Sequence, residues 1–175
     1  KLDVLAGELW YAAPDWQRHE LLEPGTYDGK TGYSKIFAVF PCDVNRDGWT
    51  DSVVTTMPGD SSWWYENPKG QPGHWQVHLV ARSACNETPI YTDLLGNGER
   101  VTLWAVQPEG YIAWFGMPKD PVKPWDMHII AGPKAPGTER FSHGLGVGDI
   151  NGDGRDDVLV TAGWWEAPED RTQEG

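Results

Sequence analysis

A nine-residue pattern that occurs twice constrains the fold of this chain more than any other feature. The pattern D-x-N-x-D-G-x-x-D covers residues 43–51 and again residues 149–157. Oxygen-bearing side chains at alternate positions, with a glycine that permits a sharp turn, are suited to wrap a hard cation such as Ca²⁺. A short run rich in β-branched residues follows each copy, so we expect each loop to join two strands. The helix-flanked, Glu-terminated loop of an EF-hand is a different pattern.

The two loops predict two calcium sites built from side-chain and main-chain oxygens. The expected ligands of the first site are the side chains of Asp43, Asn45, Asp47 and Asp51 with the carbonyl of Trp49. Those of the second site are the side chains of Asp149, Asn151, Asp153 and Asp157 with the carbonyl of Arg155. The alternative is a turn of the Asn-Gly or Asp-Gly type that needs no ion, although clustered carboxylates repel one another there. We expect a structural ion whose binding adds to folding stability.

A third, related loop is degenerate. Residues 93–101 keep the first Asp and the Gly, but they place Leu95 and Val101 where the intact loops have Asn and Asp. Because two ligands are missing, we predict that this turn keeps its shape without a metal.

A longer repeat frames the acidic loops. Four segments of the form Trp-aromatic-x-x-Pro begin at Trp10, Trp64, Trp114 and Trp164, and three of them are followed by Trp-x-x-His, which ends at His19, His78 and His128. The first Asp of the acidic loop recurs at residues 43, 93 and 149, so the repeat is about 50 residues long. Such a period, with four short strand signals per unit, is typical of propeller blades. We therefore predict an all-β fold with little helix: a partial propeller of about three to four blades, each a four-stranded antiparallel sheet.

The repeat also predicts where strands and blades lie. The expected inner strands are 36–42, 89–92 and 141–148, and the expected second strands are 3–6, 52–57, 101–106 and 158–162. Residues 1–175 then form one propeller segment, with blade pieces at roughly 1–33, 34–86, 87–138 and 139–175.

The two ends of the chain fall inside repeats. The opening residues align with 155–160, which makes Asp3 the last residue of an acidic loop, and the last Trp-aromatic segment is followed by no Trp-x-x-His. Because a ring is how propellers avoid open sheet edges, we expect a piece of a longer propeller. Assembly of further copies into a closed ring is the alternative.

Composition excludes some partners. A net charge of −12 argues against nucleic-acid binding, which requires a basic surface. No apolar run is long enough to insert across a membrane. Most of the 11 Trp residues recur at repeat positions, so we assign them to blade packing. Cys42 and Cys85 are expected to be free buried thiols, with a disulfide between blades as the alternative in a secreted protein.

A few polar and aromatic residues outside the loops are candidates for ligand binding. His19, His78 and His128 occupy one position in successive blades, so we expect each to donate to a nearby backbone group rather than to share a metal. His143 falls on an expected inner strand lining the channel. A ligand-binding or acid/base role is possible there, against an alternative of packing with water; the residues expected nearby are Arg140, Tyr33, Lys35 and Tyr91. Trp49 lies within a metal loop and is the best candidate for stacking on a sugar.

The repeated acidic loop followed by a Val- and Leu-rich strand resembles the FG-GAP/VCBS repeat, the blade unit of integrin-type and many bacterial propellers. The aromatic pattern is also similar to the propeller part of bacterial extracellular FG-GAP proteins and of aldosulose dehydratase-like enzymes. The resemblance implies a propeller, calcium in the blade loops, and a location outside the cytoplasm. It does not choose among glycan binding, adhesion and catalysis.

Two functions follow as hypotheses. The first is a calcium-binding extracellular or periplasmic module that acts as a binding or scaffold domain for a glycan or protein ligand. The second is the propeller part of a carbohydrate-active enzyme, a lyase or dehydratase, with its active site at the channel mouth. We favour the first, because no Ser-His-Asp ordering, phosphate loop or paired-carboxylate spacing is visible.

Overall fold

The protein is built from short β-strands arranged in four antiparallel sheets. The computed structural model describes residues 2–170, and within them every regular element is a strand. Accordingly, these residues contain no helix of the length and apolar character that a membrane crossing requires. The predicted all-β fold with antiparallel, blade-like sheets is confirmed.

Each sheet is a meander of consecutive strands. The first contains β1 (Val4–Ala6), β2 (Leu9–Ala12) and β3 (Gln17–Glu20). The second contains β4 (Ile36–Cys42), β5 (Asp51–Thr56), β6 (Ser62–Glu66) and β7 (Gln76–Ala81). The third contains β8 (Ile90–Thr92), β9 (Val101–Val106), β10 (Tyr111–Gly116) and β11 (Asp126–Ala131). The fourth contains β12 (Gly146–Gly148), β13 (Asp157–Val160) and β14 (Gly163–Trp165).

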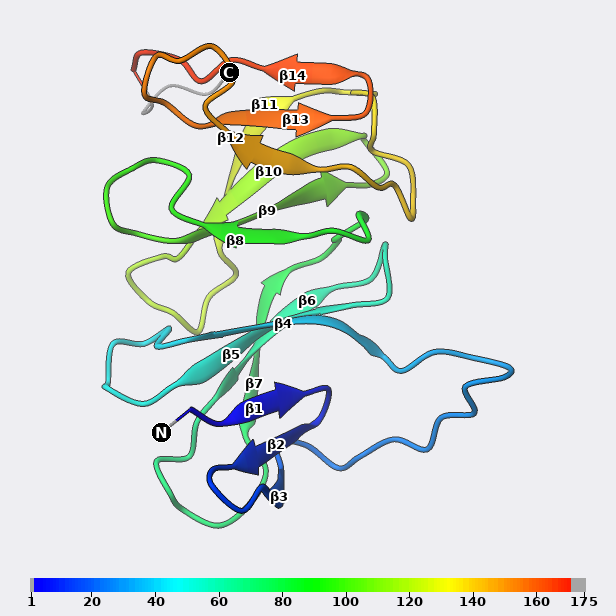
Figure 1. The fold of residues 1–175 in the computed structure, drawn as a ribbon, viewed down its shortest axis with the longest axis vertical. Coiled ribbons are helices and arrows are strands. Elements are labelled where there is room, and N and C mark those ends of the chain that lie inside the picture. Colours follow the sequence, from blue (N-terminus) through cyan, green and yellow to red (C-terminus); the bar gives the residue numbers. More distant parts are fainter. Residues whose placement is uncertain (1, 171–175) are drawn as a thin grey trace.

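The four sheets follow one another along the long axis of the molecule in the order of the sequence (Figure 1). The acidic loops are the connections β4–β5, β8–β9 and β12–β13, and all three lie on the same side of the molecule (Figure 1). Successive blades therefore present equivalent corners to solvent, as expected for a radially repeated unit.

The hydrophobic core is divided into three clusters, and each cluster joins neighbouring sheets. One unites Leu21 and Trp75 from the first two sheets, the next unites Trp64 and Trp104 from the second and third, and the last unites Leu103 with Val158 from the third and fourth. Trp64 and Trp104 are fully buried. Burying large aromatic side chains between sheets provides much of the favourable free energy of such a fold. Trp64, at a repeat position, therefore packs between blades as predicted, and Trp104, which is not at a repeat position, does so as well.

In two of the three Trp-x-x-His motifs, the Trp bonds its blade to the preceding one. The backbone N–H of Trp75 donates to the carbonyl of Leu21 at 2.8 Å, and that of Trp125 donates to the carbonyl of Val80 at 2.9 Å. Trp16, the equivalent residue in the first sheet, is 53% exposed. The same residue type thus packs between blades or faces solvent according to its neighbours.

The His residues of these motifs stack on Trp rings. The predicted bonds from these His residues to backbone groups are not found within residues 2–170. Each His lies directly opposite the Trp of the Trp-aromatic motif on the adjacent strand, and the centroids of the two rings lie 4.2, 4.3 and 3.8 Å apart in the three pairs. The pairs are Trp10 with His19, Trp64 with His78, and Trp114 with His128. The reason is register, because directly opposite side chains in an antiparallel pair lie within contact distance.

The inner strand predicted at 141–148 is shorter than expected. Only β12 forms, and the preceding residues, including His143, are not in a strand. Phe141 and Gly144 have positive φ angles of 66° and 79°, which break an extended backbone. The backbone N–H of Phe141 donates to the carbonyl of Cys85, so this segment is bonded to the connection between β7 and β8.

Candidate metal loops

The first Asp builds the same turn in all three acidic loops. Its two carboxylate oxygens accept hydrogen bonds from the backbone N–H groups four and five residues later, at 2.9 to 3.1 Å. These bonds join Asp43 to Asp47 and Gly48, Asp93 to Asn97 and Gly98, and Asp149 to Asp153 and Gly154. The Gly at the end of each turn has a φ between 81° and 86°, a conformation that favours glycine. The degenerate loop therefore keeps its shape, as predicted.

The last Asp of each intact loop is buried, and its carboxylate accepts backbone N–H groups from two chain segments. We call this arrangement a brace. Asp51 is fully buried, and its oxygens accept the N–H of Val44 at 2.9 Å and the N–H of Asn67 at 2.8 Å. Burial raises the pKa of the Asp51 carboxyl. The carboxylate therefore ties its own loop to the connection that leaves β6.

The same brace occurs at two further positions. Asp157 is fully buried and accepts the N–H of Ile150 at 2.9 Å and that of Ala167 at 2.8 Å. Asp3 accepts the N–H of Ala13 at 2.9 Å. Since Ala13 and Ala167 both lie three residues after the first Trp of their motifs, this bond supports the alignment of Asp3 with the last position of an acidic loop.

A glutamate orients the Asn in each intact loop. Asn45 donates through Nδ2 to Glu66 at 3.1 Å, and its Oδ1 accepts the N–H of Asp47 at 3.2 Å. Asn151 donates in the same way to Glu166 at 3.0 Å. Because the amide nitrogen is held by Glu, the amide oxygen faces the loop.

The sequence pattern had not led us to predict a role for these glutamates. A signal was present: a Glu lies two residues after the first Trp of the motif in both blades with an intact loop, whereas the degenerate blade has Gly116 there and Leu95 in place of the Asn. The Asn and the Glu are thus present together or absent together.

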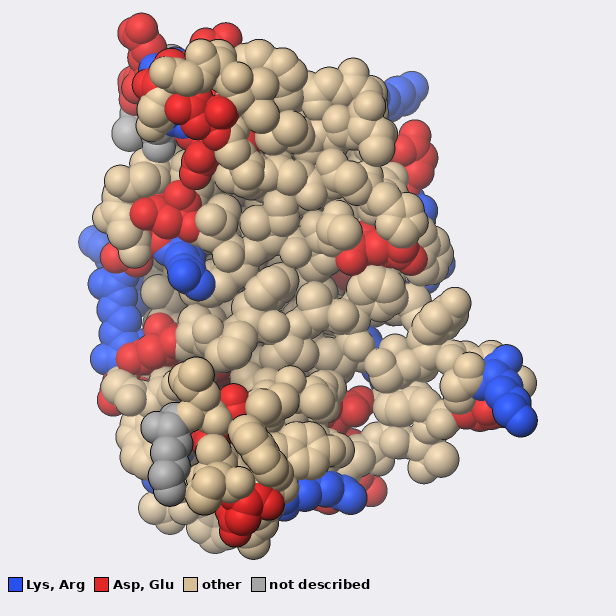
Figure 2. Space-filling view, in the orientation of Figure 1, with Lys and Arg blue, Asp and Glu red and all other residues tan. Residues whose placement is uncertain are grey.

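The central Asp of each intact loop faces a side-chain cation. Asp47 Oδ2 is shielded from solvent and lies 2.8 Å from Lys69 Nζ in an ion pair. The Lys69 ammonium lowers the pKa of Asp47. Asp153 Oδ2 lies 2.5 Å from Arg155 Nη2. Acidic and basic side chains are accordingly intermixed along the side of the molecule that carries the loops (Figure 2).

The loops fit a hard cation in donor chemistry. A carboxylate offers about four lone-pair sites, and Asp43 and Asp51 each use two for the backbone N–H groups. Lys69 shows that a positive charge is accommodated beside Asp47. Within residues 2–170, however, no three His, Cys, Asp or Glu side chains already converge as a metal-holding group. The oxygens are of the right kind, and Lys69 and Arg155 each pair with one oxygen of a central carboxylate.

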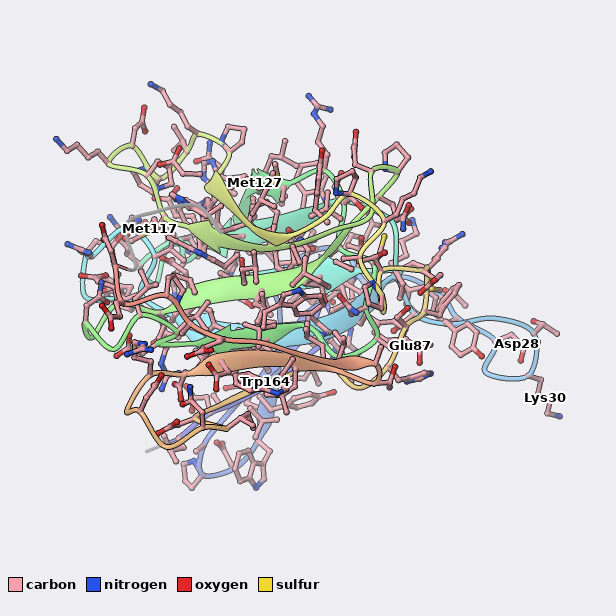
Figure 3. The ribbon with its side chains drawn as sticks, turned by 90° about the horizontal axis from the view of Figure 1, so that it is seen from above. Asp28, Lys30, Glu87, Met117, Met127 and Trp164 are labelled. Atoms are coloured by element: carbon pink, nitrogen blue, oxygen red, sulfur yellow. The ribbon has the colours of Figure 1, made fainter. Side chains whose placement is uncertain are left out.

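The candidate channel residues do not come together in one site. Tyr33 is 77% exposed and Lys35 is also exposed; both belong to the segment before β4, which projects from the body of the molecule with Asp28 and Lys30 at its tip (Figure 3). Tyr91 lines a small cavity of about 260 Å³ with Cys42 at the interface of the second and third sheets. Burial raises the pKa of both the Cys42 thiol and the Tyr91 hydroxyl.

Arg140 and His143 lie on the segment before β12. Arg140 Nε donates to the carbonyl of Pro58, and its guanidinium lies 5.0 Å from the centre of the Phe141 ring. His143 is mostly exposed, and its Nε2 lies 2.9 Å from Glu87 Oε2. Arg140 therefore bonds this segment to the β5–β6 turn of the second sheet, and His143 bonds it to the connection between β7 and β8. Cys42 and Cys85 are free cysteines.

Trp49, the remaining candidate, has its backbone in the metal loop and its side chain in a groove. The backbone N–H of Trp49 donates to Asp47 Oδ1 at 2.9 Å. The indole is 46% exposed and lines a groove of about 1150 Å³ between the first and second sheets. The loop therefore determines where this aromatic ring is presented.

Comparison with known proteins gives one match. The family model of the FG-GAP repeat matches residues 141–170, which include β12, the Asp149 loop, β13 and β14. No curated protein and no solved structure matches the chain. Residues 141–170 thus match the FG-GAP repeat, and they lie in an all-β, propeller-like fold, which confirms that resemblance; the likeness to aldosulose dehydratase-like enzymes stays a prediction.

Proposed function

We propose that this chain is a β-propeller segment that binds Ca²⁺ in the Asp43 and Asp149 loops and serves as a binding or scaffold module for a glycan or protein ligand. The proposal places it in the extracellular space or periplasm, since FG-GAP repeats typically occur in extracellular proteins. Its main support is the bond between Asn and Glu, which turns an amide oxygen into both intact loops and has no counterpart among the residues of the degenerate loop.

The residues that would hold the ions are those of the two intact patterns. In the first loop these are the side chains of Asp43, Asn45, Asp47 and Asp51 with the Trp49 carbonyl; in the second they are the side chains of Asp149, Asn151, Asp153 and Asp157 with the Arg155 carbonyl. A bound ion supplies a divalent charge that offsets part of the net charge of −12. Lys69 and Arg155 compete with it for the central carboxylates.

The experiment is thermal unfolding in EGTA and across a calcium titration, with Mg²⁺ as the comparison ion. Calcium at 100 times its dissociation constant stabilises the folded chain by about 2.7 kcal/mol per site, so the melting temperature rises with calcium concentration. Replacing both loop Asn residues by the residue of the degenerate loop, in the variant N45L/N151L, reduces that rise. The matched control L95A leaves it unchanged.

An equal melting temperature in EGTA and in millimolar calcium would contradict this proposal. Among residues 2–170, the candidate channel residues lie in separate places, so their arrangement supports the binding module over the enzyme alternative.

A further inference from the structure

A groove between the first and second sheets has no role in the proposed metal binding. Its volume is about 1150 Å³, and its aromatic lining comes from Trp10, Trp49 and Trp75. The remainder of one wall is the β6–β7 connection, residues 67–74, which is rich in Pro and Gly. A groove with aromatic walls and a few polar groups is the usual form of a ligand site.

The next interface along the molecule shows that this groove is a specific feature of the first one. There, the indole N–H of Trp64 donates to the carbonyl of Pro121 at 2.9 Å, and Trp64 is fully buried. Pro121 belongs to the β10–β11 connection, which is equivalent to residues 67–74. The cavity at that interface is only about 260 Å³.

The connection in the second sheet does not close over its neighbour in that way. It has Gln71 where the third sheet has Pro121, and Gly70 and Gly73 where the third sheet has charged residues. Trp10, the counterpart of Trp64, is only partly buried. A loop of equal length thus covers one Trp and leaves the other facing a groove.

Trp49 provides the exposed aromatic surface. Its indole is 46% exposed, whereas Trp75 on the same groove is 8% exposed. The Trp49 ring lies against Gly70, where an added Cβ would be 3.9 Å from Cη2. Because its backbone N–H is bonded to Asp47, the ring is held on an ordered corner. An ordered, solvent-facing indole is a preformed stacking surface.

A polar network completes the groove across the interface. Glu20 at the end of β3 lies 2.9 Å from Arg18 and 3.5 Å from His74, which belongs to the second sheet. All three side chains are planar and largely exposed, and they offer donors and acceptors to a ligand. The charged residues of the lining are Arg18, Glu20 and Asp3. This is close to balance in a chain with a net charge of −12.

We propose that this groove binds a neutral oligosaccharide. A pyranose ring has an apolar C–H face, which packs on an indole, and hydroxyl groups, which pair with planar polar side chains such as Arg18, Glu20 and His74. The near balance of charge in the lining favours an uncharged ligand over an ionic one. The inference deepens the proposed binding function and rests on it. It does not rest on calcium, because Trp49 would offer its carbonyl to the ion and its ring to the sugar.

The test is isothermal titration calorimetry with neutral hexasaccharides of glucose, mannose, xylose and galactose, and with a hexagalacturonate and a proline-rich decapeptide for comparison. At least one neutral hexasaccharide gives saturable binding. Trp49→Ala, which keeps the backbone carbonyl, weakens that binding about tenfold or more. Trp16→Ala removes an equally exposed indole outside the groove and leaves binding unchanged.

Three results overturn the inference: no neutral hexasaccharide binds, only the peptide or the charged sugar binds, or Trp16→Ala weakens binding as much as Trp49→Ala. The thermal shift of each variant shows that it is folded. Sugar binding that persists in EGTA, with no calcium shift, would remove the calcium proposal and leave the groove intact. A rise in melting temperature with calcium, without sugar binding, would remove the groove proposal and leave the calcium proposal intact.

Discussion

The Asp43 loop and the Asp93 loop make the same turn with different interiors. In both, the first Asp accepts the N–H groups four and five residues later. They differ at the third position, where Asn45 is held by Glu66, whereas the degenerate blade has Leu95 and Gly116 at the equivalent positions. They also differ at the last position, which is Asp51 in one loop and Val101 in the other. Both turns also use the fifth position, where the side-chain oxygen of Asp47 or Asn97 accepts the N–H two residues later. The shared turn therefore does not depend on the Asn at the third position or the Asp at the last position.

The last position shows two ways to fill one buried site. Asp51 is fully buried and satisfies two backbone N–H groups. Val101 is 3% exposed and packs in the hydrophobic cluster with Leu94 and Leu103. A buried carboxylate is tolerated only when its oxygens are hydrogen-bonded, so the intact loop depends on bonds where the degenerate loop depends on packing.

Copying the degenerate residue into the intact loop has the largest expected effect. Asp51→Val leaves the N–H groups of Val44 and Asn67 without their acceptor and destabilises the protein by about 2–4 kcal/mol. Urea unfolding in EGTA measures this loss. The control is Val101→Ile, which adds one methylene to the packed site and costs less. A loss below about 0.5 kcal/mol for Asp51→Val would show that the brace is dispensable.

Removing the first Asp tests whether the two turns are equivalent. Asp43→Ala and Asp93→Ala each remove the acceptor of two backbone N–H groups, and each costs about 1–2 kcal/mol in EGTA. The two losses agree within about 0.5 kcal/mol when calcium is absent. In saturating calcium, the loss for Asp43→Ala grows and that for Asp93→Ala does not. Equal losses under both conditions would contradict a metal role for the Asp43 loop.

Replacing Lys69 is expected to have a smaller effect, and one in the opposite direction, because it should strengthen calcium binding. Its ammonium lies 2.8 Å from Asp47, so Lys69→Met removes a competitor for the ion and tightens calcium binding a few-fold, about 1 kcal/mol. Calorimetric titration of the variant measures the change. Lys119→Met, at the equivalent position of the blade with the degenerate loop, is the matched control and leaves calcium binding as it is. Weaker binding in Lys69→Met would mean that Lys69 supports the loop instead.

The smallest effect is expected for the ion pair that joins the two loops directly. Arg46 Nη2 lies 2.8 Å from Glu99, and both side chains are more than half exposed. Exposed pairs contribute less than about 1 kcal/mol and are screened by salt. Glu99→Gln therefore changes the free energy of unfolding little, and the change disappears at high ionic strength in urea titrations. A larger loss that salt does not reduce would show that the loops are coupled by packing as well.

Local pattern was enough to predict much of this molecule. The strand at 36–42, the strand at 101–106 and the turn begun by each first Asp follow from short-range rules of alternation, glycine placement and side chain-to-backbone bonding. The repeat of about 50 residues then predicted blades, because each copy has the same short strands in the same order. Such features depend on residues that are close in the sequence.

Other features required the packed structure. The bond from Asn45 to Glu66, the ion pair from Lys69 to Asp47, and the brace from Asp51 to Asn67 join residues that only the meander of β4, β5 and β6 brings together. His143 lies outside its expected strand because Phe141 has a positive φ and is bonded to the connection between β7 and β8. The groove at Trp49 exists because the connection 67–74 leaves Trp10 partly uncovered. The sequence alone thus determined the repeated unit, through local backbone preference. The contacts between units, and the surfaces left open between them, were decided by how whole sheets pack against one another.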